Sequence, residues 1–183
     1  PSPCSPCALI LPLLLTLLLF APSAHAQRIT LDLDGTWQIL FDPENQGRHQ
    51  GWFDAGTFFA QPTREIDVPS CWEEIEQDYE GVAWYGRTFV APSTFDQVVQ
   101  LIFHAANYRA EVWLNEHLLG RHPYGYTSFH YDLTPTLSWD KPNTLKVYVD
   151  NSHQRNSRWY SGSGIYRPVW LRVRSSSAAR WAI

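Results

Sequence analysis

The segment from Asn156 to Arg167 concentrates the residue types with which proteins bind sugars. It reads NSRWYSGSGIYR and contains two arginines, three aromatic residues and two glycines. Aromatic rings cover the apolar faces of a pyranose, and fixed amide, carboxylate or guanidinium groups hydrogen-bond its hydroxyls. Asp150 and Asn151, shortly before this segment, add to the polar groups. A structural role is equally open, in which the glycines permit tight turns and the aromatic residues belong to the core.

Other reactive residue types are less informative. Cys71 has no base nearby in the sequence, and a lone cysteine is more typical of a small buried apolar residue than of a nucleophile. The four glutamates between residues 73 and 80 are predicted to form a solvated face rather than a catalytic pair. Three histidines between residues 117 and 130 have spacings of five and eight, which match no usual zinc pattern. We therefore expect no metal and no cofactor in this domain.

The composition limits the classes of protein that this chain can represent. Its 183 residues leave room for one domain of ordinary size, and a two-domain enzyme does not fit. The 14 basic and 18 acidic residues give a net charge of −4 without long runs of one sign. Nucleic-acid-binding proteins carry a basic patch or stripe, so nucleic acid is excluded as a partner.

The first 26 residues are predicted to be a secretory signal peptide. Residues 8–21 read ALILPLLLTLLLFA, an apolar run too short to span a bilayer comfortably, and Ala24-His25-Ala26 provides a small-x-small cleavage pattern. An uncleaved anchor or a buried helix is the alternative. We expect an exported protein, periplasmic or extracellular. Two of the three cysteines lie in this leader, so the mature chain is expected to form no intramolecular disulfide.

The mature chain is predicted to be all-β. Leu145, Val147 and Val149 alternate with polar or aromatic residues, which is the period of two of a half-buried strand. Turn residues between such short runs favour an antiparallel sandwich over βαβ units. Residues 43–63 are expected to be an ordered loop whose aromatic side chains pack. The nine predicted strands are residues 29–33, 36–41, 65–68, 84–90, 98–104, 110–114, 129–133, 145–149 and 169–173.

Several motifs together resemble one family. The segment RWYSGSGIYRPVWL at 158–171 resembles the motif that closes the amino-terminal sugar-binding domain of family 2 glycoside hydrolases, the group of β-galactosidases, β-glucuronidases and β-mannosidases. Further matches occur in the same order, and with the first they cover nearly all of the chain from residue 29 to 173. They are LDGTW at 33–37, VPSCW at 68–72, GVAWYGRTF at 81–89, AEVWLN at 110–115 and GYTSF at 125–129.

The resemblance implies a jelly-roll β-sandwich of the galactose-binding-domain-like kind over residues 27–174, followed by a tail at 175–183. In family members an immunoglobulin-like domain and a TIM barrel with two catalytic glutamates follow this domain. Neither is in the sequence, and retaining hydrolysis needs both carboxyl groups about 5–5.5 Å apart. We therefore interpret the chain, which lacks methionine and begins at Pro1, as a fragment that is inactive alone.

The resemblance also implies which residues contact the sugar. The amino-terminal domain of family members lends loop residues to the subsite for the terminal sugar, and the matching positions here are Asp150, Asn151, Asn156, Arg158 and Trp159. The complete protein would then hydrolyse terminal β-galactosides, β-glucuronides or related sugars, and a homo-oligomer of the complete protein is compatible with the resemblance.

Two other functions fit the same residues. The chain could be a free-standing, non-catalytic carbohydrate-binding module, or a module whose aromatic loops pack against a neighbouring domain. One departure from the family concerns a turn: Asn115-Glu116 stands where relatives usually have Asn-Gly. Because glutamate disfavours a tight type I′ turn, we expect a wider turn here.

Overall fold

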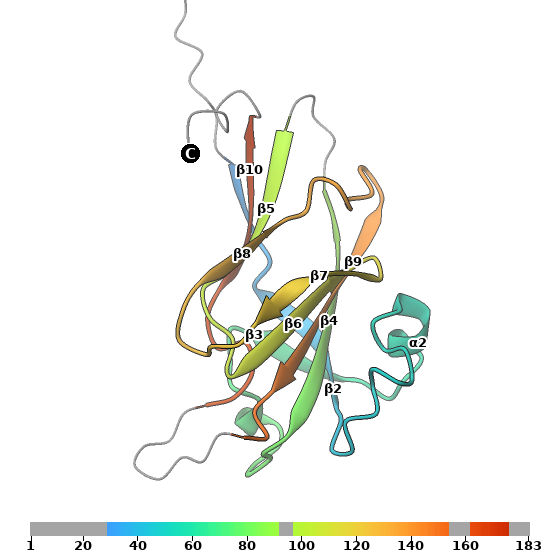
Figure 1. Cartoon of the computed structure of the whole chain (residues 1–183), viewed down its shortest axis with the longest axis vertical. Helices are drawn as coiled ribbons and strands as arrows, with labels where there is room; N and C mark the ends of the chain where they lie inside the picture. The colour runs from blue at the N-terminus through green and yellow to red at the C-terminus, as the bar shows by residue number, and fades with distance from the viewer. Residues whose placement is uncertain (1–28, 92–96, 154–161, 176–183) are drawn as a thin grey trace, which may run out of the picture.

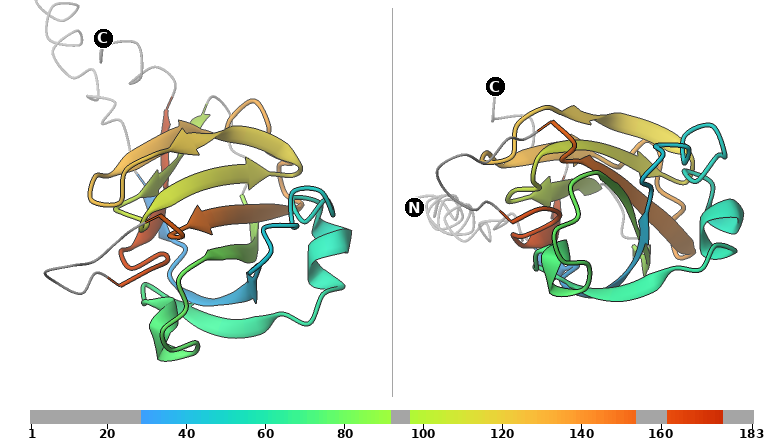
Figure 2. Two further views of the ribbon diagram at one scale, coloured as in Figure 1. Left: turned by 60° about the horizontal axis from the view of Figure 1, so that its bottom comes forward. Right: turned by 90° about the horizontal axis from the view of Figure 1, so that it is seen from below.

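Runs of alternating apolar residues form ten strands in two antiparallel sheets, within the residues that the computed structural model describes, 29–91, 97–153 and 162–175. The two-layered all-β fold predicted from the sequence is therefore confirmed, and Figures 1 and 2 show its layers. The predicted signal peptide lies outside the described residues. The strands are β1 (Ile29–Asp32), β2 (Gly35–Phe41), β3 (Arg64–Val68), β4 (Val82–Val90), β5 (Gln97–Phe103), β6 (Arg109–Leu114), β7 (His117–His122), β8 (Phe129–Asp132), β9 (Pro142–Asp150) and β10 (Val169–Ser175).

The strand order brings distant parts of the chain together. The smaller sheet has the order β1-β10-β5-β8, and the larger has the order β3-β2-β4-β9-β6-β7. Both orders contain non-consecutive neighbours, as expected of a jelly roll. Asp150 ends β9 in register with Val82 of β4 and Arg109 of β6. The end of β9 therefore meets the beginnings of two other strands at one end of the sandwich.

One continuous apolar core fills the space between the sheets. Leu101 and Phe103 of β5 face it from the smaller sheet, and Leu145 and Val147 of β9 face it from the larger sheet. All four side chains are fully buried. Burial of such side chains supplies most of the free energy of folding, because each fully buried large apolar side chain contributes roughly 1.5–3 kcal/mol.

The opposite face of the six-stranded sheet is also buried. Its own cluster contains Trp84, Trp113 and Tyr148 from the strands, and Trp52 and Phe58 from the segment between β2 and β3. That segment includes α2 (Ala55–Phe59), which lies beside the sheet in Figure 1. The expectation that residues 43–63 form an ordered segment with packed aromatic side chains is confirmed. We call residues 42–63 the cover segment.

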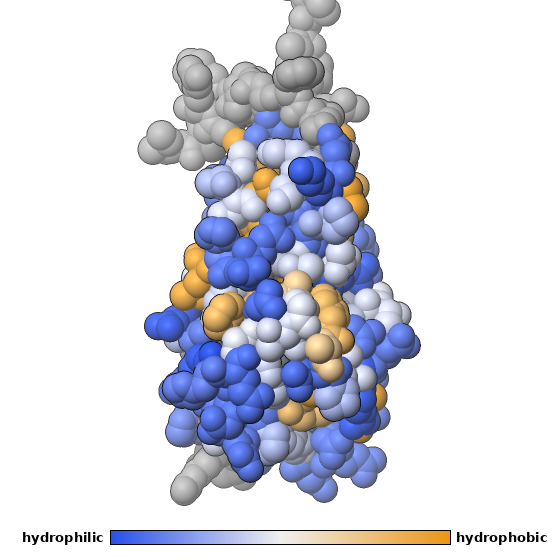
Figure 3. Space-filling view, turned by 90° about the vertical axis from the view of Figure 1, so that its right-hand side faces the viewer, coloured by the Kyte–Doolittle hydropathy of each residue, from blue (hydrophilic) through white to orange (hydrophobic). Residues whose placement is uncertain are grey.

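The cover segment buries the outer face of β9, so the prediction of a half-buried strand at 145–149 is wrong. Residues 145–149 were expected to be half-buried, but Lys146 and Tyr148 on the outer face of β9 are as buried as their inward-facing neighbours. The ammonium group of Lys146 lies 4.4 Å from the ring centre of Phe59 and 5.3 Å from that of Phe58. Outside this covered area, apolar side chains form small patches among polar ones (Figure 3).

The hairpin between β6 and β7 has a tight turn, so the prediction of a wider turn at Asn115-Glu116 is also wrong. Sequence reasoning identified no strand at β7 and expected a wide turn before it. In the structure Leu114 pairs directly with His117, so the loop has only two residues. Asn115 and Glu116 have φ angles of 46° and 71°, both in the left-handed region that a type I′ turn requires. The glutamate therefore adopts a conformation that glycine would adopt more easily.

Candidate functional site

The candidate site lies at the end of the sandwich where β9 ends. Asp150 is half-buried there, and its Oδ1 accepts hydrogen bonds from the Ser152 backbone N–H (2.9 Å) and hydroxyl (2.6 Å). These bonds form a local turn that directs the chain away from the sheet. Asp150 therefore lies at the point where the chain leaves the strand.

Asn151 joins two segments beneath the surface. It is buried, its backbone N–H donates to the carbonyl of Gly81 (2.9 Å), and its side-chain amide donates to the Ser163 hydroxyl (2.5 Å). The structure thus brings Asn151 to the segment that follows the predicted binding loop. Asn156, Arg158 and Trp159 lie outside the described residues, and their contact with a sugar stays a prediction.

Residues 162–165, which we call the anchor segment, are held from two sides. On one side, Ser70 donates to the Ile165 carbonyl and Trp72 to the Ser163 carbonyl, each at 3.1 Å. Trp72 begins η3 (Trp72–Glu74), and the Glu73 carboxylate accepts from the Ser163 N–H with both oxygens at 3.1 Å. The prediction that glutamates 73–80 form a solvated face is therefore wrong for Glu73, which is half-buried and binds a backbone donor 90 residues away.

Asn107 holds the anchor segment from the other side. Its backbone exchanges two hydrogen bonds of 2.8 Å with Gly164, and its side-chain amide donates to the Gly162 carbonyl at 2.7 Å. Gly164 has a φ of +98°, a conformation that L side chains rarely adopt, and it lies in an antiparallel bridge with Asn107 rather than in the tight turn considered from the sequence. Because its backbone groups are paired on both sides, the anchor segment is a firm base for the chain that precedes it.

Cys71 is placed beside the same segment. Its thiol lies against Gly162, where no side chain larger than hydrogen fits. Burial and the neighbouring carboxylates of Glu73 and Glu74 raise the pKa of the thiol. A raised pKa keeps the sulfur protonated, whereas a nucleophilic cysteine needs a lowered one. The environment therefore agrees with the packing role expected for Cys71.

Three tyrosines form an aromatic surface next to the anchor segment. The rings of Tyr108 and Tyr124 lie 6.1 Å apart, and those of Tyr124 and Tyr126 lie 5.7 Å apart. Tyr124 and Tyr126 are 48% and 49% exposed, so about half of the surface of each residue is accessible. We call these three residues the tyrosine patch. Sequence reasoning missed it, although the alternation Tyr124-Gly125-Tyr126 in a loop could have indicated it.

The tyrosine patch is connected to the anchor segment through the backbone. Tyr108 follows Asn107 directly, and Tyr166 donates its hydroxyl to the carbonyl of Gly125 (2.9 Å). Exposed rings, the carboxylate of Asp150 and a rigid loop base thus share one end of the sandwich. This combination suits a ligand that has both apolar faces and hydroxyl groups.

The described residues contain no group of three or more histidine, cysteine or acidic side chains that could hold a metal ion. Nor does any helix in this part of the chain have the length and apolar character to cross a membrane.

The chain is similar to several glycosidases. Residues 41–155 match the family model described as the β-galactosidase second all-β domain. The β-galactosidase BoGH2A of Bacteroides ovatus is 39% identical over 155 residues, which cover 76% of this chain and 17% of that protein. A β-glucuronidase of Paenibacillus borealis is 27% identical over 181 residues, covering 82% of this chain and 30% of that protein.

Solved structures agree with this similarity. The structure of a β-glucuronidase from an uncultured Clostridium species has 26% sequence identity and a TM-score of 0.73, covering 81% of this chain and 29% of that one. The chain thus spans less than a third of the length of these relatives.

Proposed function

The chain belongs to glycoside hydrolase family 2, and on that premise we propose that it is the carbohydrate-binding part of a longer, exported glycosidase. In this proposal the chain contributes no catalytic residue. It holds the sugar, while missing immunoglobulin-like and barrel domains carry out retaining hydrolysis of a terminal β-galactoside, β-glucuronide or related sugar. The apolar run at 8–21 and the Ala24-His25-Ala26 pattern support the export of the protein.

The observation that carries the proposal is that the tyrosine patch lies at the same end of the sandwich as Asp150, which pairs with Arg109, the residue after Tyr108. A pyranose stacks on an aromatic ring through its apolar face and needs hydrogen-bonding groups at its rim. Tyr124 and Tyr126 offer the ring faces, and Asp150 offers a carboxylate at the end of the same sheet. The predicted contacts Asn156, Arg158 and Trp159 precede the anchor segment directly in the chain, so a sugar could touch both groups.

Binding of sugars to the 183-residue chain tests this proposal. Methyl β-galactoside, methyl β-glucoside and methyl β-glucuronide are titrated into the chain, and binding is followed by the amide resonances of residues 107–109, 123–127 and 150–152. We expect the double variant Tyr124→Ala/Tyr126→Ala to weaken the binding at least tenfold, which corresponds to about 1.4 kcal/mol. The control is Leu118→Ala, which removes an equally exposed apolar side chain (47%) from β7.

The outcomes separate this function from its alternatives. Binding that the double variant leaves unchanged would overturn the role of the tyrosine patch. Absence of any sugar binding, together with tight binding of the chain to the remaining domains, would instead identify the tyrosine patch as a packing surface between domains. If the chain alone binds a sugar as tightly as the complete protein does, it acts as a self-sufficient binding module.

A further inference from the structure

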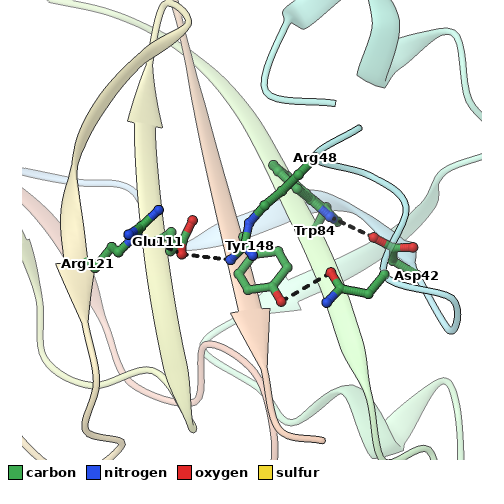
Figure 4. Close-up of polar contacts among 7 residues, drawn as sticks. Asp42, Arg48, Trp84, Glu111, Arg121 and Tyr148 are labelled. Atoms are coloured by element: carbon green, nitrogen blue, oxygen red, sulfur yellow. Dashed lines mark hydrogen bonds and ion pairs between the residues drawn. The ribbon is translucent and has the colours of Figure 1, made fainter. Parts of the chain in front are cut away.

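A second concave site lies on the outer face of the six-stranded sheet, between the cover segment and β7. It is a cleft of about 260 Å³ to which the cover segment contributes Arg48 and the sheet contributes Arg109, Glu111, Arg121 and Tyr148. Figure 4 shows Arg48 and Arg121 approaching Glu111 from opposite sides, with Arg48 in front of the Tyr148 ring. The guanidinium carbon of Arg48 lies 4.0 Å from the centre of that ring.

The charges of this cleft do not balance. A single carboxylate oxygen, Oε1 of Glu111, pairs with Nη2 of Arg48 at 2.6 Å and with Nε of Arg121 at 2.9 Å. Arg109 is exposed and forms no side-chain hydrogen bond or ion pair with another described residue. Asp150, the other acidic residue of the lining, accepts its hydrogen bonds from Ser152. Three guanidinium groups thus face two carboxylates in a protein whose net charge is −4.

Much of the hydrogen-bonding capacity of the arginines is unused. A guanidinium group has five N–H donors, and carboxylates or sulfates bind two of them at once. Arg121 bonds Glu111 only through Nε, and 68% of its side chain is exposed. Its two terminal nitrogens and the whole Arg109 guanidinium are therefore available to an anion in the cleft.

Glu111 has a carboxylate oxygen that lacks a hydrogen-bond donor. Glu111 lines the cleft and is only 8% exposed. Its Oε2 has no hydrogen-bond partner among the described residues. A buried carboxylate oxygen without a donor costs free energy, so such atoms normally have a partner. Oε2 is almost completely covered, so a hydroxyl group of a ligand in the cleft would supply this donor after a small shift of a neighbouring side chain.

A purely structural role explains part of the cluster. The pair between Arg48 and Glu111 ties the cover segment to β6, and stacking on Tyr148 fixes the Arg48 side chain. This role needs one arginine. A structural role does not account for Arg109 or for the free terminal nitrogens of Arg121. An exposed ion pair such as the one between Arg121 and Glu111 contributes little to stability.

We infer that this cleft binds a small anion that also carries hydroxyl groups, such as a sugar acid or another polyhydroxy acid. The carboxylate of the ligand contacts Arg109 and Arg121, and one of its hydroxyl groups donates to Glu111. The cleft shares Asp150 with the proposed sugar site, but no residue of the tyrosine patch lines it, so variants of the patch and of the arginines test the two sites separately.

Titration of the 183-residue chain with four probes tests this inference. Galacturonate and gluconate have both a carboxylate and hydroxyl groups, acetate has only the carboxylate, and galactose has only the hydroxyl groups. We expect the first two to shift the amide resonances of residues 109–111 and 121, and to bind at least tenfold more tightly than acetate or galactose. Their affinity should fall as salt is added, since screening weakens exposed charge pairs.

Variants locate the binding. Arg109→Gln/Arg121→Gln should weaken galacturonate binding at least tenfold without lowering the melting temperature substantially, because both side chains are exposed. Arg64→Gln, at the opposite edge of the sheet on β3, is the matched control and should leave binding unchanged.

Each contrary result overturns a defined part of the inference. Equal binding of acetate and galacturonate would show an anion site without hydroxyl recognition. Binding that survives the double arginine variant, or that disappears in Tyr124→Ala/Tyr126→Ala, would place the ligand elsewhere. If neither acid binds, the cleft serves only to hold the cover segment.

Discussion

The two faces of the six-stranded sheet bury side chains of different kinds. The inner face contributes aliphatic and aromatic residues to one continuous core. The outer face buries tryptophans together with charged residues, namely Asp42, Glu111 and Lys146. The inner face therefore depends mainly on packing, whereas the outer face also depends on how each buried charge is paired. The difference is clearest on β9, where Leu145 and Lys146 are neighbours in sequence and face opposite ways.

The largest expected effect concerns the inner face. Leu145→Ala removes a fully buried side chain and leaves a cavity between the sheets, so the free energy of unfolding should fall by about 3 kcal/mol. Urea unfolding of the chain, followed by tryptophan fluorescence, measures the change. Val90→Ala, at a site that is 55% exposed, is the control and should change stability by less than about 0.5 kcal/mol. A loss below about 1 kcal/mol for Leu145→Ala would mean that packing does not dominate the inner face.

The second effect tests a paired charge on the outer face. Asp42 accepts hydrogen bonds from the backbone N–H groups of Gln46 (2.7 Å) and Gly47 (2.8 Å) and from Nε1 of Trp84 (3.2 Å), a contact drawn in Figure 4. Asp42→Ala leaves these donors without partners and should cost about 2 kcal/mol. Asp42→Asn keeps one acceptor oxygen, so it should cost less. Equal losses for the two variants would show that the stabilisation requires both carboxylate oxygens, because asparagine keeps the volume of the side chain and alanine does not.

The third effect has the opposite sign, because Lys146 is a buried charge that forms no hydrogen bond or ion pair with a described acidic residue, although Asp54 is near enough to offset part of the effect of burial. Its Nζ is buried and forms no hydrogen bond to the described residues, and burial lowers its pKa to about 8. Replacing a poorly compensated buried charge by an apolar residue of similar volume is often stabilising. We expect Lys146→Met to raise the free energy of unfolding at pH 7 by about 1 kcal/mol, whereas Leu145→Ala on the other face lowers it.

The pH dependence of that gain identifies its cause. Between the folded pKa of about 8 and the usual value of 10.5, the unfolded chain binds more protons at Lys146 than the folded chain does. The stability that the wild type owes to this group therefore rises with pH across this window. Below pH 8 the full penalty is present, so the advantage of Lys146→Met should be largest at pH 7 and should shrink towards pH 10. An advantage that does not change with pH would indicate better packing instead of a removed charge.

The same contrast explains what could be predicted from the sequence. Alternation of Leu145, Val147 and Val149 identified the inner face, since strand geometry alone sends these side chains to one side. Alternation does not say what covers the other side. The sequence predicts only a half-buried strand here, because the cover segment that buries Lys146 and Tyr148 is joined to the sheet by contacts between residues far apart in the sequence, such as Asp42 with Trp84.

The candidate site divides in a similar way. The position of Asp150 follows from the end of an alternating run, so a local pattern was sufficient. The contacts of Glu73 with Ser163, and of Asn107 with Gly164, join residues more than 50 positions apart, and no local pattern indicates them. The tyrosine patch likewise depends on the path of two loops, and its rings are brought together only by strand pairing.

The smallest effect returns to the hairpin whose turn was predicted wrongly. Glu116 has a φ of 71°, and a residue with a Cβ pays roughly 1 kcal/mol to adopt such a conformation, whereas glycine does not. Glu116→Gly should therefore stabilise the chain by about 0.5–1 kcal/mol and raise its melting temperature by a few degrees.

Asn115 provides the matched control in the same turn. Its φ of 46° is also left-handed, but its side-chain oxygen accepts from the Thr144 N–H (2.9 Å) and its amide donates to Asn143 (2.8 Å). Asn115→Gly relieves the backbone and loses both bonds, so it should destabilise the chain. If both glycine variants stabilise it, the side chain of Asn115 contributes little. If Glu116→Gly does not stabilise the chain, the β6–β7 loop accommodates glutamate as well as glycine, and the turn is not strained at Glu116.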